Sequence, residues 1–474
     1  MLRSSPVRAS DRFDRSQWDS VAIATTVLLA FAFLLGGASR QHELRLALVE
    51  LAALPTVVLA ALALLRQEAF SRHPLAFGIL AATAALPLLQ LLPLPPALWT
   101  ALPGRAEPAL ALELSGITPE WTPLSLTPDR TWRSFLALLP PIAAFLAILA
   151  VPVETQRRVM LTILAATVAA VILGAAQLAS GGDSLYPWRT TDAGSVVGFF
   201  ANRNHLATLC LISIPFAAVL GSASLRQGGR APSAWYAALF IGLMIVALGV
   251  IRSRAGIILI WPVLGTSLLA AWVAAGRGRP PLLLLAIAAG VTAALVGVGL
   301  FALDPILARF EAGSSPEGRF ENWPIVAEAA NAYLPIGSGL GSFDSVYRSV
   351  EPLARLDATY FNQAHNEYLE IWLETGWLGV AVLAAFLVWF GRRTWTAWGA
   401  RPSSARDLQR AASIAIGAVL LHSVGDYPLR TETIAVIFAL CCGLLELAGR
   451  PDAELFGMRA GGRNVRRGTT RSAN

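Results

Sequence analysis

"QAHNEYLEIWLETGWLGV" (Gln363–Val380) joins a polar segment of the chain to an apolar one. The stretch contains one histidine, one asparagine and three glutamates, and it leads into a mostly apolar run at about 368–391. A helix of roughly 20 apolar residues crosses about 30 Å of hydrocarbon, because a helix satisfies its backbone hydrogen bonds internally. The stretch therefore predicts a membrane helix whose first turns carry ionisable side chains.

Similar apolar runs recur along the whole chain. Its 474 residues are 55% hydrophobic and only 14% charged, with a mean hydropathy of +0.59, whereas soluble domains are about one quarter charged. The sequence therefore predicts an all-α polytopic membrane protein with about 12 transmembrane helices. The predicted helices lie at about 20–37, 46–65, 74–94, 131–151, 157–179, 205–222, 234–251, 255–275, 281–302, 368–391, 409–425 and 431–448.

Arginine alone indicates the orientation of these helices, because the sequence contains no lysine. If the N-terminus is cytoplasmic, the cytoplasmic segments hold most of the arginines, as the positive-inside rule requires. We therefore predict that a leader at 1–19 and a basic tail at 449–474 are both cytoplasmic. This arrangement explains the net charge of +7, so we do not expect nucleic-acid binding. The three cysteines fall in predicted helices without metal-ligand spacing and predict no disulfide.

Two of the long loops predicted on the outer side have a distinctive composition. The loop at about 95–130 is rich in proline and contains Trp99 and Trp121, which predicts an irregular segment along the membrane interface. The loop at about 303–367, between predicted helices 9 and 10, is large enough to be partly helical. Within it we expect a helix that begins near Pro324 and ends before Pro335.

Polar residues gather at four places on the predicted outer side. The first is "ANRNH", which ends in a histidine where helix six begins, and the second is "IRSRAG", a very short outer turn. The third is "GRFENW" in the large loop, and the fourth is the stretch around His365. Each residue taken alone has an ordinary structural explanation, such as a helix cap, an interfacial arginine or a surface charge. The two arginines of "IRSRAG" need another reason, since topology disfavours arginine on the outer side.

Several kinds of site are excluded by spacing. The stretch around His365 lacks HExxH and has no second histidine four residues away, so we predict no metal. The glycines of "PIGSGLGSF" follow a helix-like segment, not a strand, which argues against a dinucleotide loop. Several outward arginines and one histidine remain. Arginines suit a pyrophosphate leaving group, and a histidine suits removal of a proton from a sugar hydroxyl. Together they predict metal-independent glycosyl transfer without a cofactor.

The motifs "FFANRNHLA", "SRAG", "GRFENW", "LPIGSGLGSF", "AHNEYLEIWLETGWLG" and "HSVGDYPLR" resemble those of the O-antigen ligase superfamily. The resemblance covers about 161–447 and implies an O-antigen ligase-like domain at 157–448, preceded by four further helices at 20–151. It implies that Arg254, Arg319 and His365 are catalytic. Lower-ranked candidates for contact with the pyrophosphate or sugar are Arg203, Arg252, Asn204, Asn366 and Glu370. For His205, Asp426 and Arg430 we favour structural roles over support of the site.

The resemblance also implies a bacterial inner membrane protein with its active site facing the periplasm. The implied donor is a glycan linked to undecaprenyl pyrophosphate, and the acceptor is either lipid A-core, for a ligase, or a second lipid-linked glycan, for a polymerase. We favour the ligase, with an O-antigen or exopolysaccharide polymerase as the alternative and a protein O-glycosyltransferase third. A transporter or flippase for lipid-linked sugars is the rival from another class, but the asymmetric outer loop argues against two similar halves.

Overall fold

A computed structural model describes most of the chain. The described residues are 9–38, 43–118, 120–181, 185–188, 194–226, 232–276, 317–353 and 361–448. The predicted helix at 281–302, the first part of the large outer loop and the basic tail lie outside them.

Helices make up nearly all of the described structure, as the sequence predicts. The elements are α1 Ala9–Leu35, α2 Glu43–Arg66, α3 Ala69–Arg72, α4 Pro74–Gln90, β1 Pro93–Leu94, α5 Pro96–Thr100, α6 Ala106–Leu114, β2 Thr122–Pro123, α7 Pro128–Leu136, α8 Leu139–Ala150, α9 Val153–Ser180, α10 Arg203–Arg226, α11 Pro232–Ile251, α12 Arg254–Ala274, α14 Glu317–Ala332, α15 Phe343–Val350, α16 Glu367–Gly399, α17 Ser404–His422, η3 Pro428–Arg430 and α18 Glu432–Glu446. Among the described residues, β1 and β2 form one short antiparallel pair.

The apolar runs correspond well to these helices. Within the described ranges, eight helices are long and apolar enough to cross a membrane. They are α1, α2, the continuous stretch of α7 and α8, α9, α10, α11, α12 and α16. Helices α4, α17 and α18 occupy three further predicted runs but fall short of that standard, α4 and α18 because they are short and α17 because it carries buried charges. The chain is thus a polytopic membrane protein.

Helix α10 lies at the centre of the bundle. It packs against α9, α11, α12 and α17, while α18 packs against α8 and α17. Nearly all of the apolar span of α10 is buried. The outer helices, in contrast, turn large apolar side chains outward: Leu51 of α2 is 60% exposed and Leu239 of α11 is 72% exposed. Such a surface suits contact with lipid, so the core of the bundle is shielded by helices that face the membrane.

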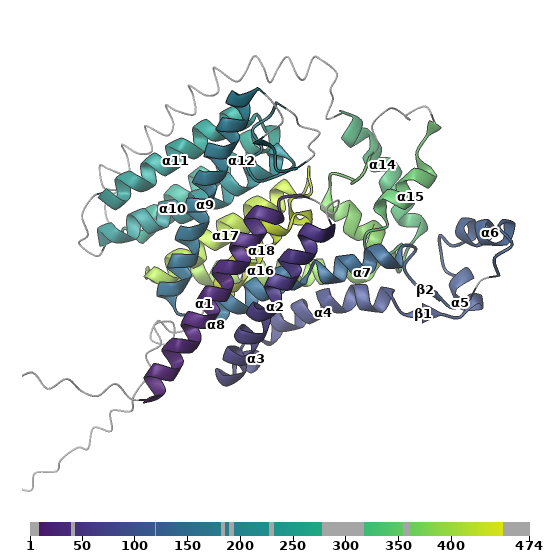
Figure 1. The fold of residues 1–474 in the computed structure, drawn as a ribbon, viewed down its shortest axis with the longest axis horizontal. Coiled ribbons are helices and arrows are strands. Elements are labelled where there is room, and N and C mark those ends of the chain that lie inside the picture. The colour runs from purple at the N-terminus through teal and green to yellow at the C-terminus, as the bar shows by residue number, and fades with distance from the viewer. Residues whose placement is uncertain are drawn as a thin grey trace, which may run out of the picture.

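The loops predicted to lie on the outer side form structure of their own at one end of the bundle, where Figure 1 shows α5, α6, α14 and α15. The loop at 95–130, which the sequence predicts to be irregular, is partly folded. It contains α5, α6 and the strand β2, which pairs with β1 immediately before the loop. Helix α14 ends before Pro335 as expected but is already formed at Glu317, seven residues ahead of Pro324. A proline in the second turn removes one backbone donor without ending this helix.

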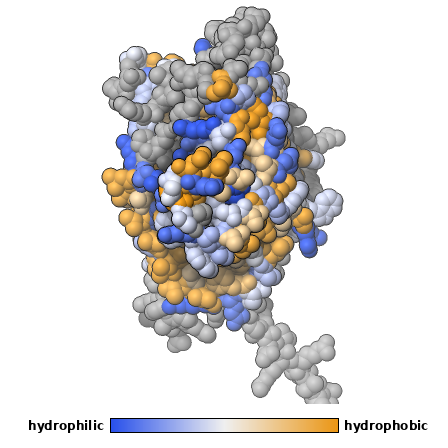
Figure 2. All heavy atoms as spheres, turned by 90° about the vertical axis from the view of Figure 1, so that its right-hand side faces the viewer, coloured by the Kyte–Doolittle hydropathy of each residue, from blue (hydrophilic) through white to orange (hydrophobic). Residues whose placement is uncertain are grey.

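This end of the molecule differs in surface from the bundle. Figure 2 views it face on and shows hydrophilic patches interspersed with hydrophobic ones. A segment embedded in hydrocarbon would present an unbroken apolar surface. The long loops at this end therefore present polar groups to water.

The glycine-rich stretch "PIGSGLGSF" clamps a kink in α16. Gly376 interrupts the helix with φ 55° and ψ −148°, and its position leaves no room for a side chain beside the carbonyl of Pro335. The amides of Gly339 and Gly341 donate to the backbone oxygen and the carboxylate of Glu374, each at 2.9 Å. A buried carboxylate is stabilised by such amides. The glycines therefore serve packing, and the dinucleotide interpretation remains discarded.

Candidate functional site

His365 lies just before α16 in a backbone conformation that side chains rarely adopt. Its φ is 50°, which costs about 1–3 kcal/mol unless neighbouring contacts impose it. The preceding peptide is held on both sides, since the amide of Ala364 donates to Glu370 Oε1 at 2.6 Å and its carbonyl accepts from Trp323 Nε1 at 3.0 Å. Asn366 then caps α16 by accepting from the amides of Tyr368 and Leu369. Hydrogen bonds at the residue before His365 and at the residue after it therefore fix the backbone conformation of His365.

The closest charged partner of His365 comes from the segment between α17 and η3. His365 Nδ1 lies 3.4 Å from Oδ1 of Asp426, which is 1% exposed. The other oxygen of Asp426 accepts from Asn204 Nδ2 at 2.6 Å, and Oδ1 also accepts from the amide of Tyr427 at 3.0 Å. Three separate parts of the chain thus meet at one buried carboxylate.

The surroundings keep Asp426 charged. Burial alone would raise its pKa, but the hydrogen bond from His365 and the nearby charges of His365, His205 and His422 hold the pKa of Asp426 well below its usual range. Three of the five histidines in the chain therefore gather around one carboxylate. In the described part of the chain, no set of these side chains has the geometry of a metal site.

Aromatic rings flank the histidine. The ring of His365 lies 4.8 Å from that of Tyr427 and 5.7 Å from that of Phe361, measured between centroids. Tyr427 also lies 5.5 Å from the ring of His205. The His365 side chain is 12% exposed, so these rings fix its orientation while a part of it remains accessible.

A second buried ion cluster joins the start of α16 to η3, which follows Asp426 in the chain. Arg430 of η3 contacts Glu370 Oε2 at 2.7 Å and Glu374 Oε2 at 3.2 Å. Burial alone would lower the pKa of Arg430, but these carboxylates and that of Glu367 raise it above its usual range. Both Glu370 and Glu374 are completely buried. The acidic residues that crowd the start of α16 are therefore largely used to attach α16 to the segment that carries Asp426.

The predicted arginines lie at the same end of the bundle. Arg254 is the first residue of α12, whose Gly256 packs against Ala207 of α10, two residues after His205. Arg252 has a left-handed backbone, with φ 56°, and an exposed side chain. Arg203 begins α10, and its Nη1 lies 3.4 Å from Ser195 Oγ. Arginines therefore lie at the start of α10, at the start of α12 and in the turn between α11 and α12.

For Arg319 the structure describes only the position of the backbone, in α14. It lies in α14, one turn before Trp323, which donates to the carbonyl next to His365. Its side chain lies outside the described structure. The backbone therefore brings Arg319 near the histidine segment.

Some of the predicted site residues contact a common carboxylate, whereas others form hydrogen bonds with backbone amides. His365 and Asn204 meet at Asp426, a residue for which the sequence favoured a purely structural role. Glu370 and Asn366, in contrast, are occupied by backbone amides. Trp323 and Tyr427 received no role from the sequence, although both stand in the quoted motifs "GRFENW" and "HSVGDYPLR". Their positions could have been a signal, but aromatic residues in a membrane protein are too common to single out.

The arrangement is suited to proton transfer. If Nδ1–H of His365 donates a hydrogen bond to the carboxylate of Asp426, the neutral ring presents Nε2 as a base. Asp426 then stabilises the imidazolium that forms when the ring takes a proton. Arginines at the same end supply positive charge for an anionic group.

Comparison with known proteins agrees with the four motifs that lie between residues 239 and 384. Residues 239–384 match the family model described as O-Antigen ligase, whereas no curated protein matches the chain significantly. The matched segment contains Arg252, Arg254, Arg319 and His365, and the family occurs in ligases and polymerases of lipid-linked glycans. The protein is therefore a multi-pass membrane protein in which residues 239–384 match the O-antigen ligase domain.

Proposed function

We propose that the protein transfers a glycan from undecaprenyl pyrophosphate to an acceptor hydroxyl, with His365 as the general base. The observation that carries this proposal is the contact between His365 Nδ1 and the buried Asp426 carboxylate at 3.4 Å. A histidine whose tautomer and orientation are fixed by a carboxylate is suited to removing a hydroxyl proton near neutral pH. The family match supports a lipid-linked glycan as the donor class.

The proposed reaction is a single displacement at the anomeric carbon of the donor. His365 Nε2 takes the proton of the acceptor hydroxyl, and the acceptor oxygen forms a bond to the anomeric carbon. The bond from that carbon to the pyrophosphate oxygen breaks, and undecaprenyl pyrophosphate leaves with the bonding electron pair. Arg254 and Arg319 stabilise the negative charge that develops on the pyrophosphate, with Arg203 and Arg252 as further contacts.

Asp426 and Glu370 act through His365 in this proposal. Asp426 orients the ring and stabilises its protonated form, while Glu370 holds the peptide before it. Asn204 fixes the second oxygen of Asp426. None of these steps needs a metal, so we propose a metal-independent transferase.

The cellular setting follows from the arginine distribution and the superfamily. We propose a bacterial inner membrane protein with both termini in the cytoplasm and the His365 site facing the periplasm. The segment 157–448 would form the ligase-like unit, with the four preceding helices attached to it. We favour lipid A-core as the acceptor, which makes the protein an O-antigen ligase; with a second lipid-linked glycan as acceptor it is a polymerase.

The test is glycan transfer in proteoliposomes that contain EDTA. The donor is a lipid-pyrophosphate glycan, offered with lipid A-core or with a second donor molecule. We expect product with the wild type and almost none with His365→Gln or Arg254→Ala. Arg348→Ala serves as the control, because Arg348 is an exposed outer arginine that pairs with Asp344.

Each outcome has a distinct meaning. The acceptor that yields product separates ligase from polymerase. Activity in His365→Gln equal to that of the wild type would remove the proposed base. Movement of labelled donor across the bilayer, without a new glycosidic bond, would favour a flippase.

A further inference from the structure

A second polar site lies at the end of the bundle opposite to His365. Helices α10, α12 and α16 all begin at the His365 end and finish here, and α17 starts here. The hydrogen bond from Arg226 Nη1 to the carbonyl of Ala274, at 2.5 Å, ties the last residues of α10 and α12 together. This end is therefore separated from the His365 site by the length of membrane-spanning helices.

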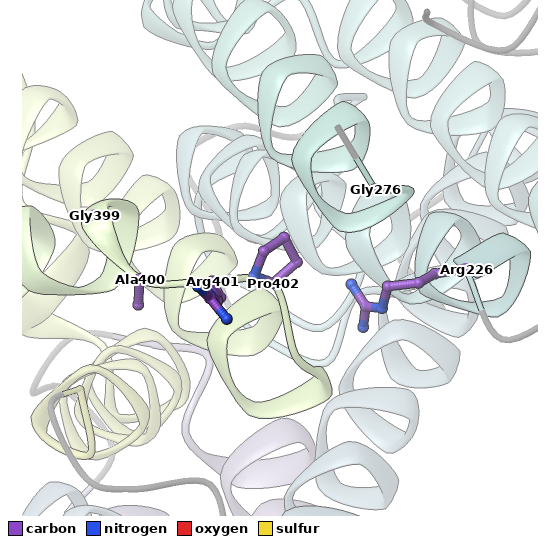
Figure 3. Close-up of a pocket in the computed structure, with 6 residues that line it drawn as sticks. All are labelled: Arg226, Gly276, Gly399, Ala400, Arg401 and Pro402. Carbon is purple, nitrogen blue, oxygen red and sulfur yellow. The ribbon is translucent and has the colours of Figure 1, made fainter. Parts of the chain in front are cut away.

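A pocket of about 490 Å³ opens between these helix ends. Figure 3 shows the guanidinium of Arg226 directed across it toward the segment that joins α16 to α17. That segment contributes Arg401 and Pro402, and the remaining lining consists of small residues, Gly276, Gly399 and Ala400. Small residues leave the space open, so the two arginines supply most of the chemical character of the pocket.

The charge around the pocket is positive. Asp407 contacts Arg226 Nη2 at 2.8 Å and Arg410 Nη1 at 3.1 Å. One negative carboxylate is therefore shared by two positive guanidinium groups. Arg410 also donates to the carbonyl of Ala400 at 2.6 Å, which fixes the pocket wall. Arg401 is exposed, and within the described ranges no hydrogen bond or ion pair engages it. The pocket therefore has an excess of positive charge and an available arginine.

The pocket lies at the ends of candidate membrane spans, where lipid headgroups are expected. It is formed where three candidate membrane spans end or have just ended. Trp395, one turn before the end of α16, is 84% exposed, and tryptophan prefers the membrane interface. A phosphate group of the adjacent leaflet would therefore be within reach of the two arginines.

We infer that this pocket binds the phosphate group of an anionic phospholipid. Guanidinium groups bind phosphate oxygens through paired hydrogen bonds, and a partly enclosed site strengthens that attraction. The α17 N-terminus, which begins two residues after Pro402, adds a favourable dipole. The site is separate from the glycan transfer reaction, so it stands or falls independently of the proposed function.

The test compares lipid retention by two arginine variants. Purified full-length protein is incubated with mixed vesicles of phosphatidylglycerol and phosphatidylcholine, re-extracted in detergent, and its bound lipid is counted by native mass spectrometry. Arg401→Gln should retain roughly fivefold less phosphatidylglycerol than the wild type, the effect of one arginine at a membrane surface. Arg392→Gln is the matched control, since Arg392 is also exposed and lies near the same end of α16.

The control separates a defined site from general attraction. Retention in Arg392→Gln equal to that of the wild type, with loss in Arg401→Gln, supports the site. Equal losses in both variants, or no loss in either, would overturn it, because a diffuse surface charge treats the two arginines alike. In a third arm, inorganic phosphate is added to the wild type. Displacement of the lipid by millimolar phosphate would overturn the lipid assignment in favour of a soluble phosphate ligand.

Discussion

Replacing Asp426 by asparagine removes the negative charge beside His365 while keeping the size of the side chain. At 3.4 Å and an effective dielectric constant of about 20, the gross attraction to a protonated ring is about 5 kcal/mol. Much of this is offset by the burial of the carboxylate, and hydrogen bonds to charged groups are worth about 1.5–3 kcal/mol net. The contact is long, so we take about 2 kcal/mol, which corresponds to about a 30-fold fall in kcat/KM.

The same substitution should change the pH dependence of transfer. His365 must be unprotonated to act as a base, so activity falls as the pH is lowered. The carboxylate of Asp426 favours the protonated ring. Its removal makes protonation harder, and the acidic limb of the kcat/KM profile should therefore move to lower pH. A purely structural role for Asp426 would lower activity without moving this limb.

The assay is initial-rate glycan transfer in proteoliposomes, measured from about pH 5 to 8.5. Asp344→Asn is the control, since Asp344 is also an ion-paired carboxylate in an outer segment. Size-exclusion profiles of both variants must match that of the wild type. If folded Asp426→Asn retains activity within about threefold and keeps its acidic limb in place, the contact with His365 does not contribute to catalysis.

Three further substitutions probe the framework of the site. Trp323→Phe loses one hydrogen bond to the peptide before the histidine, worth about 1 kcal/mol. The variant should stay folded with a slightly lower melting temperature, and kcat/KM should fall by up to about fivefold; an unchanged kcat/KM would contradict this role. Glu374→Gln breaks an ion pair and weakens two hydrogen bonds from backbone amides, so its melting temperature should fall. A melting temperature within about 1 °C of the wild type would show that Glu374 does not hold the kink of α16 in place. Gly339→Ala, at φ 110° and against the Ser125 hydroxyl, should unfold at lower temperature, whereas Gly242→Ala, which meets open space, should not.

The sequence predicted the helices well because hydropathy is a local property. Runs such as 205–222 and 234–251 correspond to α10 and α11, since any segment that crosses hydrocarbon must be apolar and helical. The outer loops were harder to predict. The segment at 95–130 forms α5, α6 and the strand β2, because its short elements depend on contacts with their neighbours and on no long apolar pattern.

By itself, the sequence determined that the chain is a helical membrane protein, that His365 stands at the entrance to a membrane helix, and that arginines lie on the same predicted side. These follow from composition and spacing along the chain. Only the tertiary structure decided that Asp426, 61 residues away, is the partner of His365, and that the glycines before α15 clamp the kink of α16. The physical reason is that such contacts depend on how helices pack across the bundle, and hydropathy specifies which segments are buried without specifying their neighbours.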